Sequence, residues 1–478
     1  MKLPLHQGSY DARSPIANAQ VAINLLPEQN PADAPFPVTM YPAPGLSLMT
    51  DQSAWGNKVR GMYVASDGAL YVAVGVNILR FTGYPFTATQ IGAFPEDSLL
   101  PVSICDNGTT VVAVDGTVNS LYATLGSNTM TAVSDPAWYG SARVDFIDTF
   151  FVFNQPGTGN FYTSTSNAFL PIDPLYFAAK EGWNDRVQCC ACLHDNIWVL
   201  GAVTSEIWFN AGGAAFPFAR MPNSILQQGC AATFSVVIAD NAIYWLSQDR
   251  WGHAIMMRGE GYSARRVSNF AVENAWRSYN YNLSDAIGMA FQIGGHEFIG
   301  LRFPLVNKFW VYDASTQMWH ERTYNGTSAG WLPNCTAFWQ SVPGAITPLQ
   351  TLMIAGDSTS GRIMIIDAAT YTDVGTPITR QRSWPHQQQD GQRINYTRFA
   401  LSMAGNQLSP DTVTLDWSDD AGLSYGSGVA QTVNQQSNGQ YLWRRLGYGR
   451  DRVYRATWTG NGEFALNGAY SDGTPAAT

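Results

Sequence analysis

The chain has 478 residues, more than one ordinary compact core needs, and 45% of them are hydrophobic while only 13% are charged. With 13% aromatic residues, 44 glycines and 25 prolines, this balance excludes a disordered chain and is typical of an all-β protein with many turns. The net charge of −9 argues against a sequence-independent DNA-binding protein, which needs a basic face, but it allows a channel through which DNA slides.

Residues 1–50 form a proline-rich first segment. Proline lacks an amide donor and fixes φ, so we expect an extended arm here and neither a helix nor a regular central strand. The short apolar pieces at 21–26 and 46–48 need a partner surface, in the same subunit or in the next one. The segment has no apolar run of signal-peptide length, and no run of about 18 apolar residues occurs in the chain, so we expect no membrane insertion.

Residues 51–375 repeat one pattern, in which a short apolar strand, a polar turn and a second strand recur. The steps between successive second strands are 40, 40, 46, 46, 55 and 55 residues. These strands begin near Leu70, Thr110, Phe150, Asn196, Ala242, Glu297 and Leu352. A period in the forties with about four strands per unit predicts a β-propeller, because neighbouring sheets must cover each other's faces. We predict seven blades, with six as the alternative because the last two steps are the longest.

One helical stretch interrupts the repeat at residues 269–279. Phe270, Ala271, Asn274, Ala275 and Tyr279 fall near helical spacing, which predicts a short surface or contact helix.

Residues 376–478 begin with a polar, glutamine-rich connector and continue with four apolar, alternating stretches. These stretches are RFALSMAG, TVTLDWSDD, YLWRRLG and VYRATWTG. They predict a small C-terminal β-sandwich, followed by a loose tail over residues 471–478.

No motif with catalytic, cofactor-binding or metal-binding spacing stands out. Cys189, Cys190 and Cys192 lack the spacing of paired metal ligands, so we expect free thiols in apolar strands. The six histidines are expected to be ordinary surface or turn residues. The run from Ser418 to Tyr425 resembles an Asp-box, a hairpin turn in which Asp420 would bond the amides of its own turn and Gly422 would take a positive φ.

Two other functions stay open at this point. The first is a carbohydrate-binding propeller, such as a receptor-binding tail protein, because tryptophans on blade loops suit sugar stacking, although they could equally pack between blades or subunits. They are Trp138, Trp183, Trp251, Trp331 and Trp339. A glycoside hydrolase would need two facing carboxylates near the propeller axis, which a sequence cannot place.

Arginines gather near the C-terminus, where five of the 27 basic residues lie within 12 positions. They are Arg444, Arg445, Arg450, Arg452 and Arg455. The plain interpretation is a hairpin with a cationic solvent face. The functional interpretation is a contact with an acidic partner ring or a neighbouring subunit, and binding of passing DNA is the weakest option because a tight grip would hinder its release.

Both ends of the chain carry a family resemblance. The matching stretches are Ala12-Arg13-Ser14-x-Ile16-Ala17-Asn18-Ala19-Gln20, Asn24-Leu25-x-Pro27-Glu28, Pro37-Val38-Thr39, Pro44-Gly45-Leu46, Trp443-Arg444-Arg445-Leu446-Gly447 and Gly449-Arg450-Asp451-Arg452-Val453-Tyr454. They resemble the tail-hub proteins of short-tailed phages, also called nozzle or packaged-DNA stabilisation proteins.

The resemblance implies a structural protein of the virion tail that is assembled in the host cytoplasm. It implies six copies in a ring below the head-to-tail adaptor, connected to a tail needle, fibre or tailspike. That ring would extend the DNA channel, retain the packaged genome and allow its ejection, without sequence-specific binding of the passing duplex. The expected contact residues with the neighbouring subunit or the adaptor are Arg13, Asn18, Gln20, Arg444, Arg445, Arg450 and Arg452.

Overall fold

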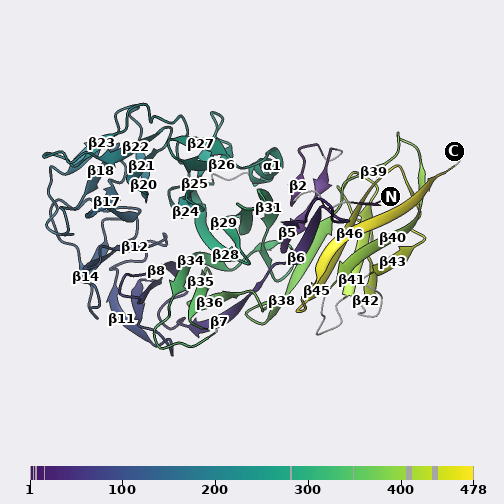
Figure 1. The fold of residues 1–478 in the computed structure, drawn as a ribbon, viewed down its shortest axis with the longest axis horizontal. Helices are drawn as coiled ribbons and strands as arrows, with labels where there is room; N and C mark the ends of the chain where they lie inside the picture. The colour runs from purple at the N-terminus through teal and green to yellow at the C-terminus, as the bar shows by residue number, and fades with distance from the viewer. Residues whose placement is uncertain are drawn as a thin grey trace.

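The computed structural model describes residues 2–3, 5, 8–14, 17–279, 283–347, 349–404, 412–432 and 440–476. Within these residues a ring of seven four-stranded sheets lies beside a two-sheet sandwich (Figure 1). The prediction of an all-β chain with a seven-bladed propeller and a C-terminal sandwich is confirmed.

The first five blades are each built from four consecutive strands. Their strands are β8 (Val59–Val64), β9 (Leu70–Val74), β10 (Asn77–Phe81) and β11 (Ala88–Ala93); β12 (Ser103–Asp106), β13 (Thr110–Val114), β14 (Ser120–Thr124) and β15 (Thr131–Ala132); β16 (Val144–Ile147), β17 (Phe150–Asn154), β18 (Asn160–Thr163) and β19 (Phe177–Ala179); β20 (Val187–Leu193), β21 (Asn196–Gly201), β22 (Ser205–Asn210) and β23 (Phe218–Arg220); β24 (Val237–Ala239), β25 (Ala242–Gln248), β26 (Ala254–Glu260) and β27 (Ser263–Arg266).

The last two blades belong to one larger sheet that continues into the sandwich. The sixth blade is β28 (Ile287–Ile293), β29 (His296–Phe303), β30 (Lys308–Asp313) and β31 (Met318–Glu321), and the seventh is β34 (Pro333–Gln340), β35 (Thr351–Asp357), β36 (Arg362–Asp367) and β7 (Gly45–Asp51). Strand β7 comes from the N-terminal segment and pairs antiparallel with β36. The ring therefore closes only with a strand from the opposite end of the propeller sequence.

The second strand of a blade is buried on both faces, as in β9 and β17, where all five residues are buried. Neighbouring blades cover the two faces, so these strands are continuous apolar runs rather than alternating ones. Turns that the sequence marks hold the hairpins. In the turn between β8 and β9, Gly68 has φ +80° and the Asp67 carboxylate accepts a hydrogen bond from the Ala69 amide at 3.0 Å.

The sandwich packs two sheets over a core rich in aromatic rings. One sheet has the order β43 (Gln440–Arg444), β40 (Ile394–Ala404), β46 (Ala465–Pro475), β6 (Val38–Pro42) and β5 (Leu25–Gln29), with β1 (Lys2–Leu3) and β44 (Tyr448–Gly449) at its side; the other contains β38 (Thr376–Ser383), β45 (Asp451–Gly460), β41 (Thr412–Ser418), β42 (Val429–Thr432) and β39 (Gln387–Gln388). The core joins Trp384, Phe399 and Trp458 with Leu25 and Met40 of the N-terminal segment.

The N-terminal segment is thus threaded through both parts of the molecule. Its strand β4 (Ala22–Ile23) lies between β31 of the propeller and β38 of the sandwich, and β37 (Thr372–Asp373) pairs with both β38 and β7. The expectation that this segment holds no central strand is wrong for β6, which lies between β46 and β5. Proline is tolerated because Pro42 ends β6 and Pro27 lies in the edge strand β5. The divisions at residues 50 and 375 stay predictions.

Several smaller elements complete the chain. They are the hairpin β2 (Tyr10–Asp11) and β3 (Ala19–Gln20), the hairpin β32 (Thr323–Tyr324) and β33 (Ala329–Gly330), and the 3-10 turns Thr233–Ser235 and Leu283–Asp285. The tail predicted to be loose is wrong up to Pro475, because β46 pairs along β40; Ala477 and Thr478 lie outside the described residues.

The predicted helix is present as α1 (Phe270–Ser278), and the Asn269 side chain caps it by accepting a hydrogen bond from the Val272 amide at 2.9 Å. Its buried residues are Ala271, Val272, Glu273 and Trp276, whereas Phe270 is 71% exposed. The spacing therefore predicts the helix correctly, and the structure adds which of its residues are buried.

A substitution at Gly45, the first residue of β7, tests how far the fold depends on this strand. A Cβ on residue 45 would lie 2.1 Å from the Thr372 carbonyl oxygen, so backbone must move. We expect Gly45→Ala to lower the free energy of unfolding by about 1–3 kcal/mol, as overpacking does. Gly426→Ala is the matched control, because its Cβ would meet nothing nearer than 3.8 Å. Chemical denaturation of both variants measures the difference, and equal stabilities would contradict the dependence.

Candidate functional site

The seam between propeller and sandwich is held by buried polar side chains on either side of β4. Asn24 donates to Thr323 Oγ1 and to the Thr379 carbonyl, both at 2.8 Å, and accepts from the Thr323 amide at 3.0 Å. Thr323 belongs to the propeller side and Thr379 to the sandwich strand β38. One fully buried amide therefore bonds both parts at once.

Gln20, one of the predicted contact residues, lies inside this seam. It is 3% exposed, and its Oε1 accepts a hydrogen bond from Arg382 at 2.5 Å. Arg382 also donates to the Gly8 carbonyl at 2.8 Å and has no acidic partner among the described residues. Burial lowers the pKa of Arg382 to about 9. The Gln20 side chain is therefore bonded to this buried cation within the subunit, and its role in a contact with another subunit stays a prediction.

A second buried arginine lies at the join between the seventh blade and the segment that leads to the sandwich. Arg322 donates to the Pro44 carbonyl at 2.8 Å and lies over the Trp331 ring at 4.1 Å from its centroid. Trp331 Nε1 in turn donates to Asp373 at 3.2 Å. Burial raises the pKa of Asp373 to about 6, although Arg322 acts against that rise. Residues from three distant segments thus share one charged site.

His320 of β31 is next to this site and is fully buried. Neither ring nitrogen has a hydrogen-bond partner among the described residues. Burial, and then the nearby Arg322, lower the pKa of His320 to about 3. The prediction of a surface or turn histidine is wrong here, because the arm strand β4 and the seam cover β31, the outer strand of its blade.

The free end of the sandwich carries the arginine-rich stretch, and Arg452 is its buried member. Its guanidinium bonds the Asp419 carboxylate at 2.7 and 2.8 Å and the Leu446 carbonyl at 2.7 Å. Its side chain lies over the Tyr396 ring at 4.3 Å and is 1% exposed. Arg452 therefore holds the Asp-box turn against the sandwich, and its role in a contact with another subunit stays a prediction.

That turn has the geometry that its sequence predicts. Asp420 accepts a hydrogen bond from the Ser424 amide at 2.9 Å, the Ser418 hydroxyl accepts one from the Gly422 amide at 2.8 Å, and Gly422 has φ +89°. Bonds from the Ser418 and Ser424 side chains and from the Ser424 amide lower the pKa of Asp420 to about 2. The turn is a structural device at the end of β41.

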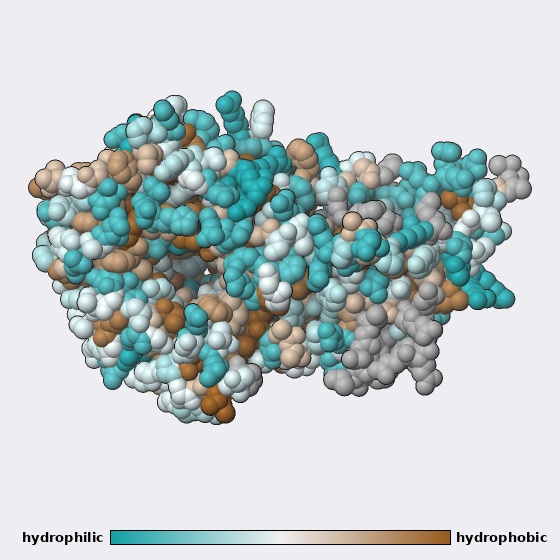
Figure 2. Space-filling model, viewed as in Figure 1, coloured by the Kyte–Doolittle hydropathy of each residue, from teal (hydrophilic) through white to brown (hydrophobic). Residues whose placement is uncertain are grey.

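Four exposed arginines at this end of the sandwich form the group that we call the end arginines. They are Arg393, Arg444, Arg445 and Arg450. None forms an ion pair with a described acidic residue, whereas Asp419, Asp451 and Asp472 are paired with Arg452, His386 and Arg398. The sequence missed Arg393, which lies about 50 positions earlier and joins the group because β40 pairs with β44. Hydrophilic residues gather over this end in the visible face (Figure 2).

The remaining predicted contact residues lie in the β2–β3 hairpin. Arg13 is exposed, and the half-buried Asn18 accepts a hydrogen bond from the Gln20 amide at 3.2 Å. Pro15 and Ile16 of the same stretch lie outside the described residues. Arg13, Arg444, Arg445 and Arg450 thus remain accessible, but the structure does not gather them into one site.

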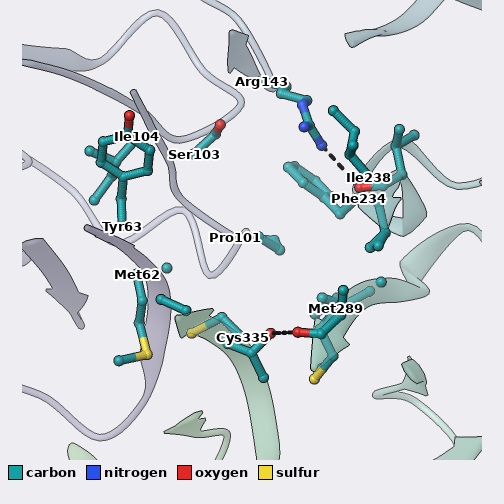
Figure 3. Close-up of a pocket in the computed structure, with 18 of the residues that line it drawn as sticks. Met62, Tyr63, Pro101, Ser103, Ile104, Arg143, Phe234, Ile238, Met289 and Cys335 are labelled. Atoms are coloured by element: carbon teal, nitrogen blue, oxygen red, sulfur yellow. Dashed lines mark hydrogen bonds between the residues drawn. The ribbon is translucent and has the colours of Figure 1, made fainter. Parts of the chain in front are cut away.

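The propeller encloses a central cavity of about 680 Å³ (Figure 3), and the ring is hollowed at this point in the space-filling view (Figure 2). Arg143 points across the cavity toward the turn with Phe234, donates to the Val236 carbonyl at 3.0 Å and pairs with Asp145 at 3.3 Å. The other carboxylate of the lining, Glu297, is bonded by Gln292. The described lining brings no two free carboxylates together.

The tryptophans considered for sugar stacking divide into two sets. Trp138, Trp331 and Trp339 are buried, and Trp339 Nε1 donates to the Gly68 carbonyl of the first blade at 2.9 Å. Trp183 and Trp251 are 61% and 86% exposed. Packing within and between blades accounts for the buried three.

The six cysteines are free, and Cys189 and Cys190 are buried in β20. Among the described residues, no group of three or more histidine, cysteine, aspartate or glutamate side chains could hold a metal ion. No helix in the described part of the chain is long and apolar enough to cross a membrane.

Comparison with protein families gives two matches that lie end to end. Residues 1–371 match a family described as bacteriophage P22 Gp10, beta-propeller, and residues 379–473 match the family described as bacteriophage P22 Gp10, beta-sandwich. A comparison with curated proteins found no match.

Among solved structures, the chain is similar to the extracellular domain of BT4673 from B. thetaiotaomicron, with 10% identity and a TM-score of 0.44. That match covers 84% of this chain and 47% of the other, so the chain spans about half of that structure. The designed Ika8 protein gives 10% identity, a TM-score of 0.37 and coverage of 77% and 99%. The N-terminal domain of Nup159 gives 8% identity and a TM-score of 0.38, and the match covers 72% of this chain and 98% of the other.

The buried imidazole of His320 makes the seam sensitive to acid. Above pH 6.5 the His320 ring is neutral in both the folded and the unfolded protein. Below pH 6.5 the ring binds a proton in the unfolded protein, whereas in the folded protein it stays neutral down to about pH 3. The free energy of unfolding therefore falls as the pH falls below 6.5. Between pH 7 and 5 the wild type should lose about 2 kcal/mol more unfolding free energy than His320→Leu. Other groups, including Asp373, affect both proteins alike. Parallel pH curves from chemical denaturation would contradict this account.

Proposed function

The chain belongs to the bacteriophage P22 Gp10 family of phage tail structural proteins, and from this premise we propose that it is a tail-hub, or nozzle, subunit. Copies of it, six in our proposal, form a ring below the head-to-tail adaptor. The ring extends the DNA channel, helps to retain the packaged genome and lets it leave on infection. The observation that carries the proposal is the pair of family matches, which together cover the propeller, the arm and the sandwich.

The proposed mechanism is mechanical and needs no catalytic group. The cavity of a single propeller has a volume of only about 680 Å³. A DNA duplex cannot pass through so small a space, because its major groove, which is only part of the duplex, is already about 12 Å wide. The channel therefore has to form between copies. The net charge of −9 supports a wall that repels DNA and lets it slide.

The partners in this proposal are the adaptor ring above and a tail needle, fibre or tailspike below, with assembly in the host cytoplasm. The exposed Arg13 and the end arginines support contacts with acidic surfaces, because accessible cations that form no ion pair with a described acidic residue can steer association. Deletion of residues 1–45 would also remove β4, β5 and β6, which belong to the seam and the sandwich sheet. A loss of assembly in that variant would therefore not identify a contact made by the arm.

The first experiment measures the mass of the purified protein, alone and mixed with the adaptor ring of its phage, followed by negative-stain imaging. We expect a six-fold ring with a central hole, formed either by the protein alone or on the adaptor. A monomer or trimer that ignores the adaptor would contradict the proposal.

A point variant tests the arm hairpin without disturbing its buried strands. We expect Arg13→Glu to weaken adaptor binding several-fold and to reduce its salt dependence, because Arg13 is exposed at the tip of the hairpin. Arg250→Glu, which changes an equally exposed arginine in a propeller loop, is the matched control. Equal affinities of the two variants in a titration against the adaptor would remove the hairpin from the contact.

A further inference from the structure

A cleft of about 160 Å³ lies where the arm, the sixth blade and the sandwich meet. Prolines of β5, β6 and the following turn form part of its wall, and Tyr41 and Tyr371 contribute two aromatic rings. Glu28 and Glu463 stand at its rim. We call this site the acidic cleft and define it by Glu28, Tyr41, Tyr371 and Glu463.

The two carboxylates act on the same point of the cleft. After burial, Glu28 and Glu463 are the causes that raise the pKa of Tyr41, so both lie within electrostatic range of one phenol. Both glutamates are exposed, and neither has a cationic partner among the described residues. Arg380 of the same chain already lies 5.9 Å from the Tyr371 ring centroid, so the cleft offers the Tyr41 ring together with two carboxylates that have no cationic partner among the described residues.

A guanidinium group fits this chemistry better than other side chains do. It stacks flat on an aromatic face, and its planar fork matches a carboxylate. The chain already pairs these groups inside itself: Arg455 lies 3.6 Å from the Tyr425 ring centroid and pairs with Asp416.

Arginines without an acidic partner lie at the other end of the same sandwich. Strand β45 begins at Asp451, directly after Arg450, and ends at Gly460, three positions before Glu463. Its 10 residues span about 33 Å at the usual rise of a strand. The acidic cleft and the end arginines are therefore too far apart to meet within one copy, and they mark opposite ends of the sandwich.

We propose that copies of this chain bind one another head to tail, with one of the end arginines of a copy seated in the acidic cleft of the next and the others lying beside it. The proposal rests on the ring assembly proposed above and names the surfaces that form it. A contact between two different surfaces is heterologous, and it closes into a ring when the rotation between copies allows. The charge complementarity of two otherwise unpaired sets selects a second copy as the occupant.

Charge reversal tests the pairing of the two surfaces. Variant one carries Glu28→Lys and Glu463→Lys, and variant two carries Arg444→Glu, Arg445→Glu and Arg450→Glu. Sedimentation velocity at low salt should show self-association of the wild type and at least tenfold weaker association of each variant alone. An equimolar mixture of the variants should associate again, because every cleft then faces an end of opposite charge.

Controls separate this pairing from a general effect of charge. Asp195→Lys and Arg250→Glu alter exposed charges elsewhere on the propeller and should associate like the wild type. Thermal melting verifies that each variant is folded. Variants that associate as strongly as the wild type, a mixture that fails to restore association, or a wild type that stays monomeric at low salt would each overturn the inference.

Imaging on the adaptor ring distinguishes this failure from failure of the proposed function. Rings formed by both charge-reversed variants on the adaptor would overturn the head-to-tail contact and leave the tail hub standing. Wild-type protein that forms no ring there would overturn the tail hub itself. Normal self-association of variant one combined with loss of adaptor binding would assign the cleft to the adaptor and also overturn the inference.

Discussion

Pairing of the N-terminal segment with the last two blades is the interaction on which the arrangement of the two parts depends. The repeat region supplies only three strands to the seventh blade, and the missing one, β7, comes from the N-terminal segment. The outer strand of the sixth blade is covered by β4, which pairs with β38 on its other side. An open edge exposes a row of unpaired amide and carbonyl groups. Satisfying two such edges with one segment joins the propeller to the sandwich.

The same threading explains why charges are buried at the seam. Arg382 and Arg322 bond the carbonyl oxygens of Gly8 and Pro44, both of which belong to the N-terminal segment. A buried cation is costly without such partners, and a buried ion pair adds less stability than its geometry suggests. Both arginines therefore obtain these carbonyl partners only when the segment lies in its place.

Local patterns in the sequence predict local structure well, and long-range pairing is where they fail. The Asp67–Gly68 turn and the Asp420 turn are both present, since each needs only neighbours within a few positions. The apolar residues near Leu46 indicate that the segment needs a partner, but its sequence does not indicate that the partner is β36. The amide of Val21 bonds Ser383, 362 positions away, and the burial of Gln20 follows from that pairing. The buried face of α1 likewise depends on what covers the helix, not on its own spacing.

The arginine-rich stretch shows how one run of like charges divides into two roles. Arg452 and Arg455 lie in β45 and form ion pairs with Asp419 and Asp416. Their charges are therefore already paired within the subunit. An exposed, unpaired arginine costs little in water and stabilises little. What Arg444, Arg445 and Arg450 can contribute must therefore come from a partner. Copies with a net charge of −9 repel one another at a distance, and a head-to-tail contact brings opposite charges together where they touch. Assembly would then depend on salt and on register more than on buried area.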